Sequence, residues 1–372
     1  MKLVYFTHSL ASCWNHGNAH FLRGVLRELM LRGHAVLACE PRGAWSLENL
    51  LRDHGEAGLA ASLAPYPELR SLAYAGLEDV APALADADAV VVHEWSEPWL
   101  VAALGRARRL GGARFTLLFH DTHHRAVSDP EAIRRFDLEG YDGVLAFGEA
   151  LAQVYRRWGW GGRVFTWHEA ADTRLFRPPA VEGERNGLVW IGNWGDEERS
   201  AELEGFLLRP AQAVGLPLDI HGVRYPPHAL AMLERYGARY RGWLPNAQAP
   251  EVFARHLATV HVPRRFYVER LPGIPTIRVF EALACGIPLV CSPWQDAEGL
   301  FRPGEDYLVA RDEAEMRRHL AALRDDAGLR AALAANGLRT IAARHGCAHR
   351  AEELLAILAA LGHAAEARET AA

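Results

Sequence analysis

The sequence predicts an α/β protein with two doubly wound parallel sheets, one in each of two domains. Short apolar runs alternate with helix-length segments, which is typical of parallel strands covered by helices on both faces. A chain of 372 residues exceeds one typical hydrophobic core, so we expect two domains. Between residues 171 and 186 the pattern gives way to Pro, Gly and charged residues, which indicates a linker. We therefore expect domains over residues 1–170 and 187–345.

The first domain begins with a strand, a helix and a second strand. The apolar run Met1–Phe6 predicts a buried strand, and the helical spacing of apolar residues predicts a helix over Asn18–Gly33. A second strand is expected over His34–Cys39. The polar loop Thr7–Asn18 follows the carboxyl end of the first strand, where ligands bind in open α/β sheets. It is not G-x-G-x-x-G, and an ordinary surface loop fits it about as well as an active-site loop.

Polar residues follow two of the later strands of this domain. The residues at these two strand exits are His93, Glu94, His120, Asp121 and His123. Because parallel strands end at one edge of the sheet, we expect these side chains at the same rim. Further strands of this domain are expected over Asp88–Trp95, Arg114–His124, Asp142–Gly148 and Arg163–His168.

Acid/base chemistry or acceptor binding is the function that this rim favours. We take Asp121, His120 and Glu94 as candidates for acid/base work, and His93 and His123 as acceptor-binding residues. A metal site is one alternative, but His120 and His123 are expected in a strand-exit loop and not as an i, i+4 helical pair. Ordinary loop histidines are the other.

The acidic pair Asp86 and Asp88 has the literal D-x-D spacing of some metal-dependent transferases. The pair precedes a strand within an Ala-rich segment, where closing a helix and beginning a turn explains it. We assign it no function, and no metal site is predicted.

The second domain repeats the strand and helix alternation. Strands are expected over Gly187–Asn193, Pro217–Gly222, Ala238–Trp243, Ala258–Pro263, Pro288–Ser292 and Asp306–Val309. Helices are expected from about Glu197 and over Asn246–His256, and the tail from Asp312 to Gly362 reads as helical.

A short, mostly buried helix over Thr276–Ala284 is the most informative element of the chain. Gly286 suits the position after a helix, and the restricted Leu271–Pro275 segment before it leaves the amides near Thr276 and Ile277 at a positive helix end. Such an end suits a phosphate. Glu281 is flanked by apolar residues, and a buried carboxylate needs a hydrogen-bond or charge partner. A ligand hydroxyl would provide one, and so would a nearby arginine.

The run Arg278–Val290 resembles the C-terminal signature of nucleotide-sugar glycosyltransferases of the GT-B fold. In particular it is similar to the spore-maturation-type branch of the retaining group. The resemblance implies two Rossmann-like domains facing a cleft, with Glu281 accepting hydrogen bonds from the donor ribose and the preceding amides holding the diphosphate. The larger retaining group carries a second glutamate eight positions upstream of Glu281, where this chain has Gly273.

Other donor-binding residues follow from the same resemblance and from the strand exits. Gly192 and Asn193 follow a strand directly, so a phosphate or sugar can approach the backbone. The family's basic pair is absent there, and we expect Arg264, Arg265 and Arg278 to replace it. A surface salt-bridge pair is the alternative. By resemblance the nucleotide base lies near His221 and Trp243, although packing explains a Trp there equally well.

The resemblance also assigns the loop and the ends of the chain. His16, Gly17 and Asn18 occupy the place of a Gly-rich loop that faces the cleft in related enzymes, so His16 joins the acid/base candidates and Gly17 and Asn18 the acceptor-binding residues. Related chains cross into the donor domain at a segment like Asp172–Pro178. A terminal helix over 346–362 is expected to pack back on the first domain, and residues 363–372 are expected to be disordered.

Composition narrows the class of protein. The formal charge of −5 argues against a nucleic-acid partner, and no run reaches membrane-spanning length. The five cysteines form no C-x-x-C, which fits a reduced cytoplasm.

We therefore predict a cytoplasmic glycosyltransferase that moves a sugar from a nucleoside-diphosphate sugar to an acceptor. The acceptor would be a sugar, a lipid-linked molecule or a small molecule. We expect no metal or cofactor, and the resemblance favours retention of anomeric configuration. A nucleotide-sugar epimerase of the same fold and a non-catalytic sugar-nucleotide-binding protein are the alternatives.

Overall fold

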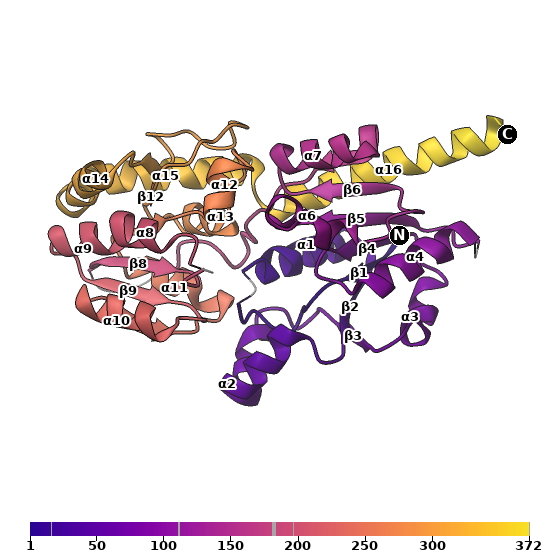
Figure 1. Ribbon diagram of the computed structural model, residues 1–372, viewed down its shortest axis with the longest axis horizontal. Helices are drawn as coiled ribbons and strands as arrows, with labels where there is room; N and C mark the ends of the chain where they lie inside the picture. The colour runs from indigo at the N-terminus through magenta and orange to yellow at the C-terminus, as the bar shows by residue number, and fades with distance from the viewer. Residues whose placement is uncertain (16, 111, 181–183, 196, 372) are drawn as a thin grey trace. The chain divides into compact units, whose positions relative to one another are not determined.

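The protein consists of two compact units, each built on one parallel sheet (Figure 1). The computed structural model describes residues 1–372 apart from 16, 111, 181–183, 196 and 372, and the side chains of 363–371 are also left undescribed. Unit 1 comprises Met1–Cys13, Phe21–Glu169 and Cys347–Ala372; unit 2 comprises Trp14–His20 and Ala170–Gly346.

Unit 1 contains a seven-stranded sheet of order β3-β2-β1-β4-β5-β6-β7, in which every neighbouring pair is parallel. The order reverses between β1 and β4, which is the switch point where such sheets bind ligands. Its elements are β1 (Lys2–Phe6), α1 (Ala19–Leu31), β2 (Ala35–Pro41), α2 (Trp45–Leu63), β3 (Ser71–Tyr74), α3 (Leu77–Leu84), β4 (Ala89–His93), α4 (Pro98–Leu110), β5 (Thr116–Asp121), α5 (Arg125–Ser128), α6 (Pro130–Arg134), β6 (Gly143–Ala146), α7 (Glu149–Tyr155), η1 (Arg156–Trp160), η2 (Gly161–Arg163), β7 (Val164–Thr166) and α16 (Cys347–Ala371).

The central strands of unit 1 are continuous apolar runs because both of their faces are covered. Every residue of β4 and of β6 is buried. Alternation of buried and exposed residues, the signature of a one-sided sheet, is absent from these two strands. The edge strand β3, in contrast, buries only Tyr74, and the sequence analysis missed it.

Unit 2 contains a six-stranded parallel sheet of order β10-β9-β8-β11-β12-β13, with its switch point between β8 and β11. Its elements are β8 (Leu188–Ile191), α8 (Ser200–Leu203), η3 (Glu204–Leu208), α9 (Arg209–Ala213), β9 (Leu218–His221), α10 (Pro227–Arg235), β10 (Arg239–Gly242), η4 (Asn246–Gln248), α11 (Ala249–Ala254), β11 (Ala258–His261), α12 (Arg265–Glu269), α13 (Ile277–Ala284), β12 (Leu289–Cys291), β13 (Leu308–Val309), α14 (Glu313–Asp325) and α15 (Ala327–Arg344). The predicted α/β class with two parallel sheets is confirmed.

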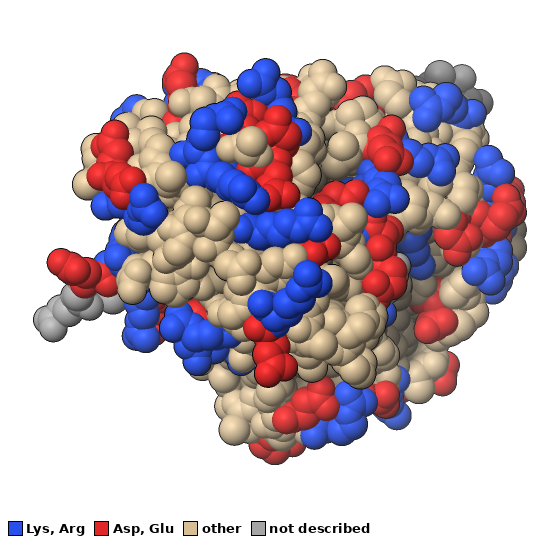
Figure 2. Space-filling model, turned by 60° about the vertical axis from the view of Figure 1, so that its left-hand side comes forward, with Lys and Arg blue, Asp and Glu red and all other residues tan. Residues whose placement is uncertain are grey.

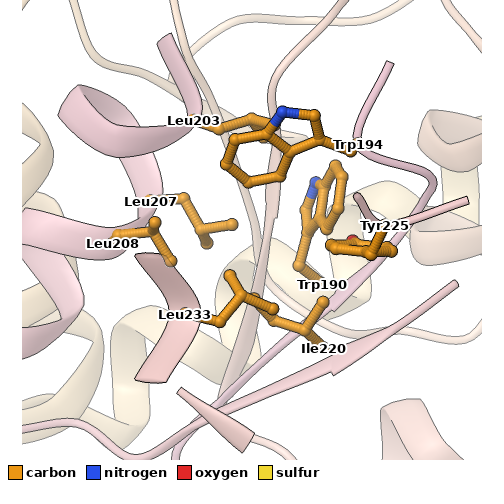
Figure 3. A pocket seen from close by; sticks show the side chains of 8 residues that line it. All are labelled: Trp190, Trp194, Leu203, Leu207, Leu208, Ile220, Tyr225 and Leu233. Carbon is orange, nitrogen blue, oxygen red and sulfur yellow. The ribbon is translucent and has the colours of Figure 1, made fainter. Parts of the chain in front are cut away.

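The core of unit 2 is packed by apolar side chains of its strands and helices, Trp190 and Trp194 among them. Figure 3 shows eight side chains of this core around a small gap, Tyr225 and Leu233 among them. The gap is too narrow to hold a water molecule. It is a packing irregularity of the core and not a ligand site.

The last helix differs from the expectation at its end. α16 runs from Cys347 to Ala371, whereas the sequence analysis expected disorder from residue 363. Ala, Glu and Arg are strong helix formers, and the segment after Gly362 is rich in them, so the helix continues. The beginning of α16 belongs to unit 1, where the indole nitrogen of Trp167 donates to the Arg350 carbonyl at 2.9 Å.

Candidate functional site

The helix α13 of unit 2 begins at the carboxyl edge of the sheet, next to the switch point. Its start is Ile277, with Thr276 at the N-cap, and every residue from Val279 to Ala284 is buried. After the helix Gly286 takes a φ of +63°, the left-handed conformation expected of a residue that ends a helix. The predicted helix is therefore present, and its positive end lies where the sequence placed it.

The Thr276 hydroxyl does not cap its own helix. A threonine at an N-cap normally accepts a hydrogen bond from an amide of the first turn, but no such bond forms here. The hydroxyl instead lies 3.0 Å from Nε2 of the buried His261, whose Nδ1 lies 3.5 Å from Sγ of Cys291. Burial lowers the pKa of His261 to about 3, so its imidazole is neutral. The first-turn amides of α13 are therefore left without the cap that Thr276 would supply.

Glu281 is fully buried and already paired. One carboxylate oxygen accepts from the guanidinium of Arg278, and the other lies 3.0 Å from Nδ1 of His20. Burial alone would raise the pKa of Glu281, but the charge of Arg278 and the contact with His20 outweigh it and hold the pKa below its ordinary value. The carboxylate thus has the nearby arginine that the sequence analysis gave as the alternative to a ligand hydroxyl.

His20 is a partner of Glu281 that the sequence analysis missed. Its Nδ1 lies 3.2 Å from the Gly17 carbonyl as well as 3.0 Å from Glu281, and because both neighbours only accept, this nitrogen carries the proton. Its Nε2 is buried without a hydrogen-bond partner among the described residues. Nothing in the sequence links two residues 261 positions apart, so no signal could have found this pair.

Gly17 and Asn18, which are predicted to bind the acceptor, belong to unit 2. The Gly17 carbonyl accepts from Nδ2 of Asn246 at 3.1 Å, and a Cβ at Gly17 would lie 3.2 Å from the Ile277 side chain. Gly17 therefore lies against the start of α13, within unit 2. His16, the fourth acid/base candidate, lies outside the described residues.

Arg264 and Arg265 are not free phosphate ligands in this structure. Nε of Arg264 pairs with Glu198, and the Arg265 guanidinium lies 2.9 Å from a carboxylate oxygen of Glu202. Figure 2 shows the same pattern more broadly, with Lys and Arg interleaved with Asp and Glu over the face it presents. These pairs are the salt-bridge alternative of the sequence analysis, which leaves Arg278 as the predicted arginine that lies on α13.

The turn after β8 is closed by its own hydrogen bonds. The Gly192 carbonyl accepts from the Tyr225 hydroxyl at 2.9 Å, and the Asn193 side chain donates to Asn15 at 2.8 Å. The buried Arg199 also donates to the Asn193 carbonyl, at 2.8 Å. Gly192 and Asn193 directly follow β8 as predicted, but these polar groups already have partners.

His221 ends β9 and Trp243 follows β10, and these are the two strands at one edge of the sheet. Both are half-buried, and burial lowers the pKa of His221 to about 4, so the ring is neutral. The structure places the two residues near the ends of adjacent strands, which is consistent with the predicted base-binding region.

The rim of unit 1 brings the predicted acid/base residues together at its switch point. Glu94 follows β4 and Asp121 ends β5, and both are fully buried. Asp121 accepts from the Tyr155 hydroxyl at 2.7 Å and from the His123 amide at 3.0 Å, so each of its oxygens has a donor. Glu94 pairs with Arg125 through Oε2, and its Oε1 has no partner among the described residues.

The two carboxyl groups of this rim hold their protons more tightly than usual. Burial, with a smaller contribution from the charge of Asp121, raises the pKa of Glu94 to about 8 although Arg125 opposes the change. Burial raises the pKa of Asp121 to about 6, against the hydrogen bonds from Tyr155 and His123. At neutral pH the pair therefore carries less than two negative charges.

The histidines of the rim are neutral or hydrogen-bonded within it. His120 bonds through Nδ1 to the Tyr5 hydroxyl, and burial lowers its pKa to about 3. Nε2 of His93 lies 3.0 Å from the Thr122 hydroxyl, and the His123 ring lies edge-on to Trp95 at 5.3 Å. No three His, Cys, Asp or Glu side chains of the described residues converge as metal ligands, and the expectation of a metal-free reaction stays a prediction.

The acidic D-x-D pair has a structural role. Asp86 pairs with the Lys2 ammonium, and Asp88 accepts from the Lys2 amide at 2.6 Å. The pair fixes the start of β1, as expected of residues without a catalytic function.

No helix in the described part of the chain is long and apolar enough to span a membrane.

Comparison with known families gives one match. Residues 199–356 match the sequence model of the family described as "Glycosyl transferase-like". No curated protein matches the chain.

Solved structures of low sequence identity share the fold. An α-glucosyltransferase in complex with UDP and a 13-mer DNA has a TM-score of 0.68 at 12% identity, covering 96% of this chain and 99% of that one. A glycosyltransferase from Rickettsia africae has a TM-score of 0.67 at 8% identity, covering 97% and 98%. Anabaena Alr3699/HepE in complex with UDP and glucose has a TM-score of 0.64 at 14% identity, covering 97% and 100%.

One prediction from composition needs correction. The formal charge of −5 was taken to exclude a nucleic-acid partner, but one protein of this fold has been solved with DNA. Net charge sums over the whole surface, whereas an acceptor contacts one part of it. A negative net charge therefore does not exclude a nucleic-acid acceptor.

The comparisons agree with the two parallel sheets of the fold. The predicted enzyme class, a glycosyltransferase, is confirmed by the family match over residues 199–356. The spore-maturation-type branch is not distinguished by that match. The chain has two parallel-sheet units and is covered almost end to end by these solved structures, so it has the GT-B fold.

Proposed function

We propose that the protein transfers a sugar from a nucleoside-diphosphate sugar, and that unit 2 binds this donor at the start of α13. The observation that carries the proposal is the helix start, where the Thr276 hydroxyl contacts His261 and caps none of the first-turn amides, so that a positive helix end without a side-chain cap faces an anion. UDP is present in two of the similar solved structures, which supports a diphosphate ligand for this fold.

Arg278 is the cation that we assign to the diphosphate. Its side chain lies one residue into α13 and is 25% exposed, so it reaches both solvent and the buried Glu281. The Glu281 carboxylate pairs with the Arg278 guanidinium through one oxygen, and its other oxygen contacts His20. These contacts hold the Arg278 side chain in place. The donor ribose would take over one of these contacts on Glu281. Fixed cationic groups at the diphosphate stabilise the charge that develops on the leaving group, without a metal ion or other cofactor.

Retention of configuration is part of the proposal. Inversion needs a base that removes the acceptor proton, but Asp121 already accepts two hydrogen bonds and the raised pKa of Glu94 leaves it mostly protonated at pH 7. Proton transfer to the leaving phosphate, which retention allows, avoids this difficulty. The anomeric configuration of the product, read by NMR, tests this part.

A thermal-shift panel tests the donor site. UDP, dTDP, GDP and the corresponding sugar nucleotides are added to the wild type, to Glu281→Ala and to Glu251→Ala, an exposed control in the same unit. A ligand at 100 times its Kd raises the free energy of unfolding by about 2.7 kcal/mol. We expect at least one diphosphate to stabilise the wild type and Glu251→Ala but not Glu281→Ala. Equal shifts in all three would remove Glu281 from the donor site.

Turnover separates a transferase from its two alternatives. We expect release of nucleoside diphosphate that an acceptor mixture accelerates. Donor isomerisation without acceptor would indicate an epimerase, and binding without turnover would indicate a sugar-nucleotide-binding protein.

A further inference from the structure

The carboxyl edge of the unit 1 sheet carries exposed tryptophans. Trp95 is 44% exposed and Trp99 43% exposed in the loop and helix start after β4, and Trp45, which begins α2 after β2, is 44% exposed. Among the described residues, the one other strongly exposed aromatic side chain is Tyr240 of unit 2. Exposed large apolar side chains collected at the ligand-binding edge of a sheet indicate a binding surface.

Trp95 is held rigidly and joined to the buried carboxyl cluster. The Arg125 guanidinium lies over its ring, 4.0 Å from the ring centroid, and the His123 ring meets it edge-on. The same guanidinium bonds to the Glu94 carboxylate. An aromatic platform, a guanidinium donor and a carboxyl group thus lie in contact, and one oxygen of Glu94 has no partner among the described residues.

This combination of groups matches the surface of a sugar. A pyranose ring has a C–H face that packs on the electron-rich face of an indole, and hydroxyls at its edge that pair with carboxyl and guanidinium groups. After β4, the stretch from Glu94 to Gly105 that carries Trp95 and Trp99 has two acidic residues, Glu94 and Glu97, and no Lys or Arg. Such a stretch favours a neutral polyol over a phosphate backbone, which acidic side chains repel.

We infer that the acceptor is a saccharide, and that unit 1 binds it with a sugar ring stacked on Trp95 and a hydroxyl directed towards Glu94 and Arg125. This inference rests on the proposed function, because it names the acceptor of that transfer. Trp99 and Trp45 extend the same edge, so a saccharide of more than one ring gains further contacts.

Binding of neutral oligosaccharides tests the inference without requiring a donor. Maltotriose, cellotriose, chitotriose and mannotriose are titrated into the full chain, with binding followed by saturation-transfer NMR and calorimetry. The variants are Trp95→Ala, Trp95→Phe and Trp160→Ala. Trp160 is the matched control, because an arginine also lies over its ring, Arg163 at 4.6 Å from the centroid, but Trp160 ends the helical segment η1 and does not follow a strand.

We expect at least one oligosaccharide to bind the wild type, with affinity about ten-fold weaker in Trp95→Ala, partly restored in Trp95→Phe and unchanged in Trp160→Ala. No binding by any oligosaccharide, or equal loss in Trp95→Ala and Trp160→Ala, would overturn the inference. A DNA oligonucleotide run in parallel that binds through Trp95 in place of the sugars would also overturn it.

The donor assay distinguishes failure of this inference from failure of the proposed function. Trp95→Ala should keep the thermal shift with a nucleoside diphosphate, because Trp95 belongs to unit 1 and the donor site to unit 2. A normal diphosphate shift without saccharide binding would refute the acceptor class alone. Absence of the diphosphate shift in the wild type would refute the proposed function.

Discussion

Replacing Glu94 with glutamine is expected to change how the stability of the protein depends on pH. The Glu94 carboxyl is fully buried, and burial together with the charge of Asp121 raises its pKa to about 8. The unfolded chain ionises this carboxyl near pH 4.5, so between that pH and 8 the folded state binds the proton more tightly. The stabilisation that the proton gives is complete below pH 4.5 and is lost as pH rises through 8.

The size of the effect follows from the two pKa values. A rise from 4.5 to about 8 corresponds to about 5 kcal/mol between these limits, at 1.36 kcal/mol for each tenfold change in proton affinity. Asp121 titrates with Glu94, and relaxation around the ionised pair reduces the cost. We therefore expect a fall of roughly 2–5 kcal/mol in the free energy of unfolding of the wild type from pH 5 to pH 8.

Urea unfolding at pH 5, 6, 7 and 8 measures this fall. Glu94→Gln removes the titration, so its free energy of unfolding should fall less steeply than that of the wild type, with Asp121 accounting for most of the remaining slope. Glu97→Gln is the matched control, because Glu97 lies in the same loop and is exposed. Parallel curves for wild type and Glu94→Gln would refute the idea that Glu94 holds a proton in the folded protein.

Two further substitutions test packing and pairing. Gly105→Ala should lower the free energy of unfolding by about 1–3 kcal/mol, because its Cβ would lie 2.4 Å from the Glu139 carbonyl oxygen, whereas Gly162→Ala, with nothing within 4 Å, should have little effect on the urea midpoint. His20→Ala should cost about 1–3 kcal/mol in the same assay, because one oxygen of the buried Glu281 loses its partner; an unchanged midpoint would show that Arg278 alone satisfies this carboxylate.

Much of the fold was predictable because most strands and helices have a local signal, namely the spacing of apolar residues and the residues at turns. The apolar run of β4 and the helix α13, with Gly286 after it, were identified from spacing and turn residues alone. The edge strand β3 was missed, since a short strand with one buried residue leaves little hydrophobic signal. The helical end of α16 was missed because the end of a chain is commonly disordered, although its residues favour helix.

The sequence predicted where the site residues lie in the fold, but it did not predict which side chains pair with one another. The strand exits correctly grouped Glu94 with Asp121, because parallel strands end at one edge. Which carboxylate meets which cation depends on tertiary contacts, so the pairing of Glu281 with His20 and of Arg264 with Glu198 could not be read from spacing.

Amide hydrogen exchange of the full chain with and without UDP tests the central claim most directly. If the start of α13 holds the diphosphate, UDP should slow exchange in peptides covering residues 271–284, and Glu281→Ala should lose this protection. A diphosphate that stabilises the protein but protects other segments, leaving 271–284 unchanged, would contradict the account.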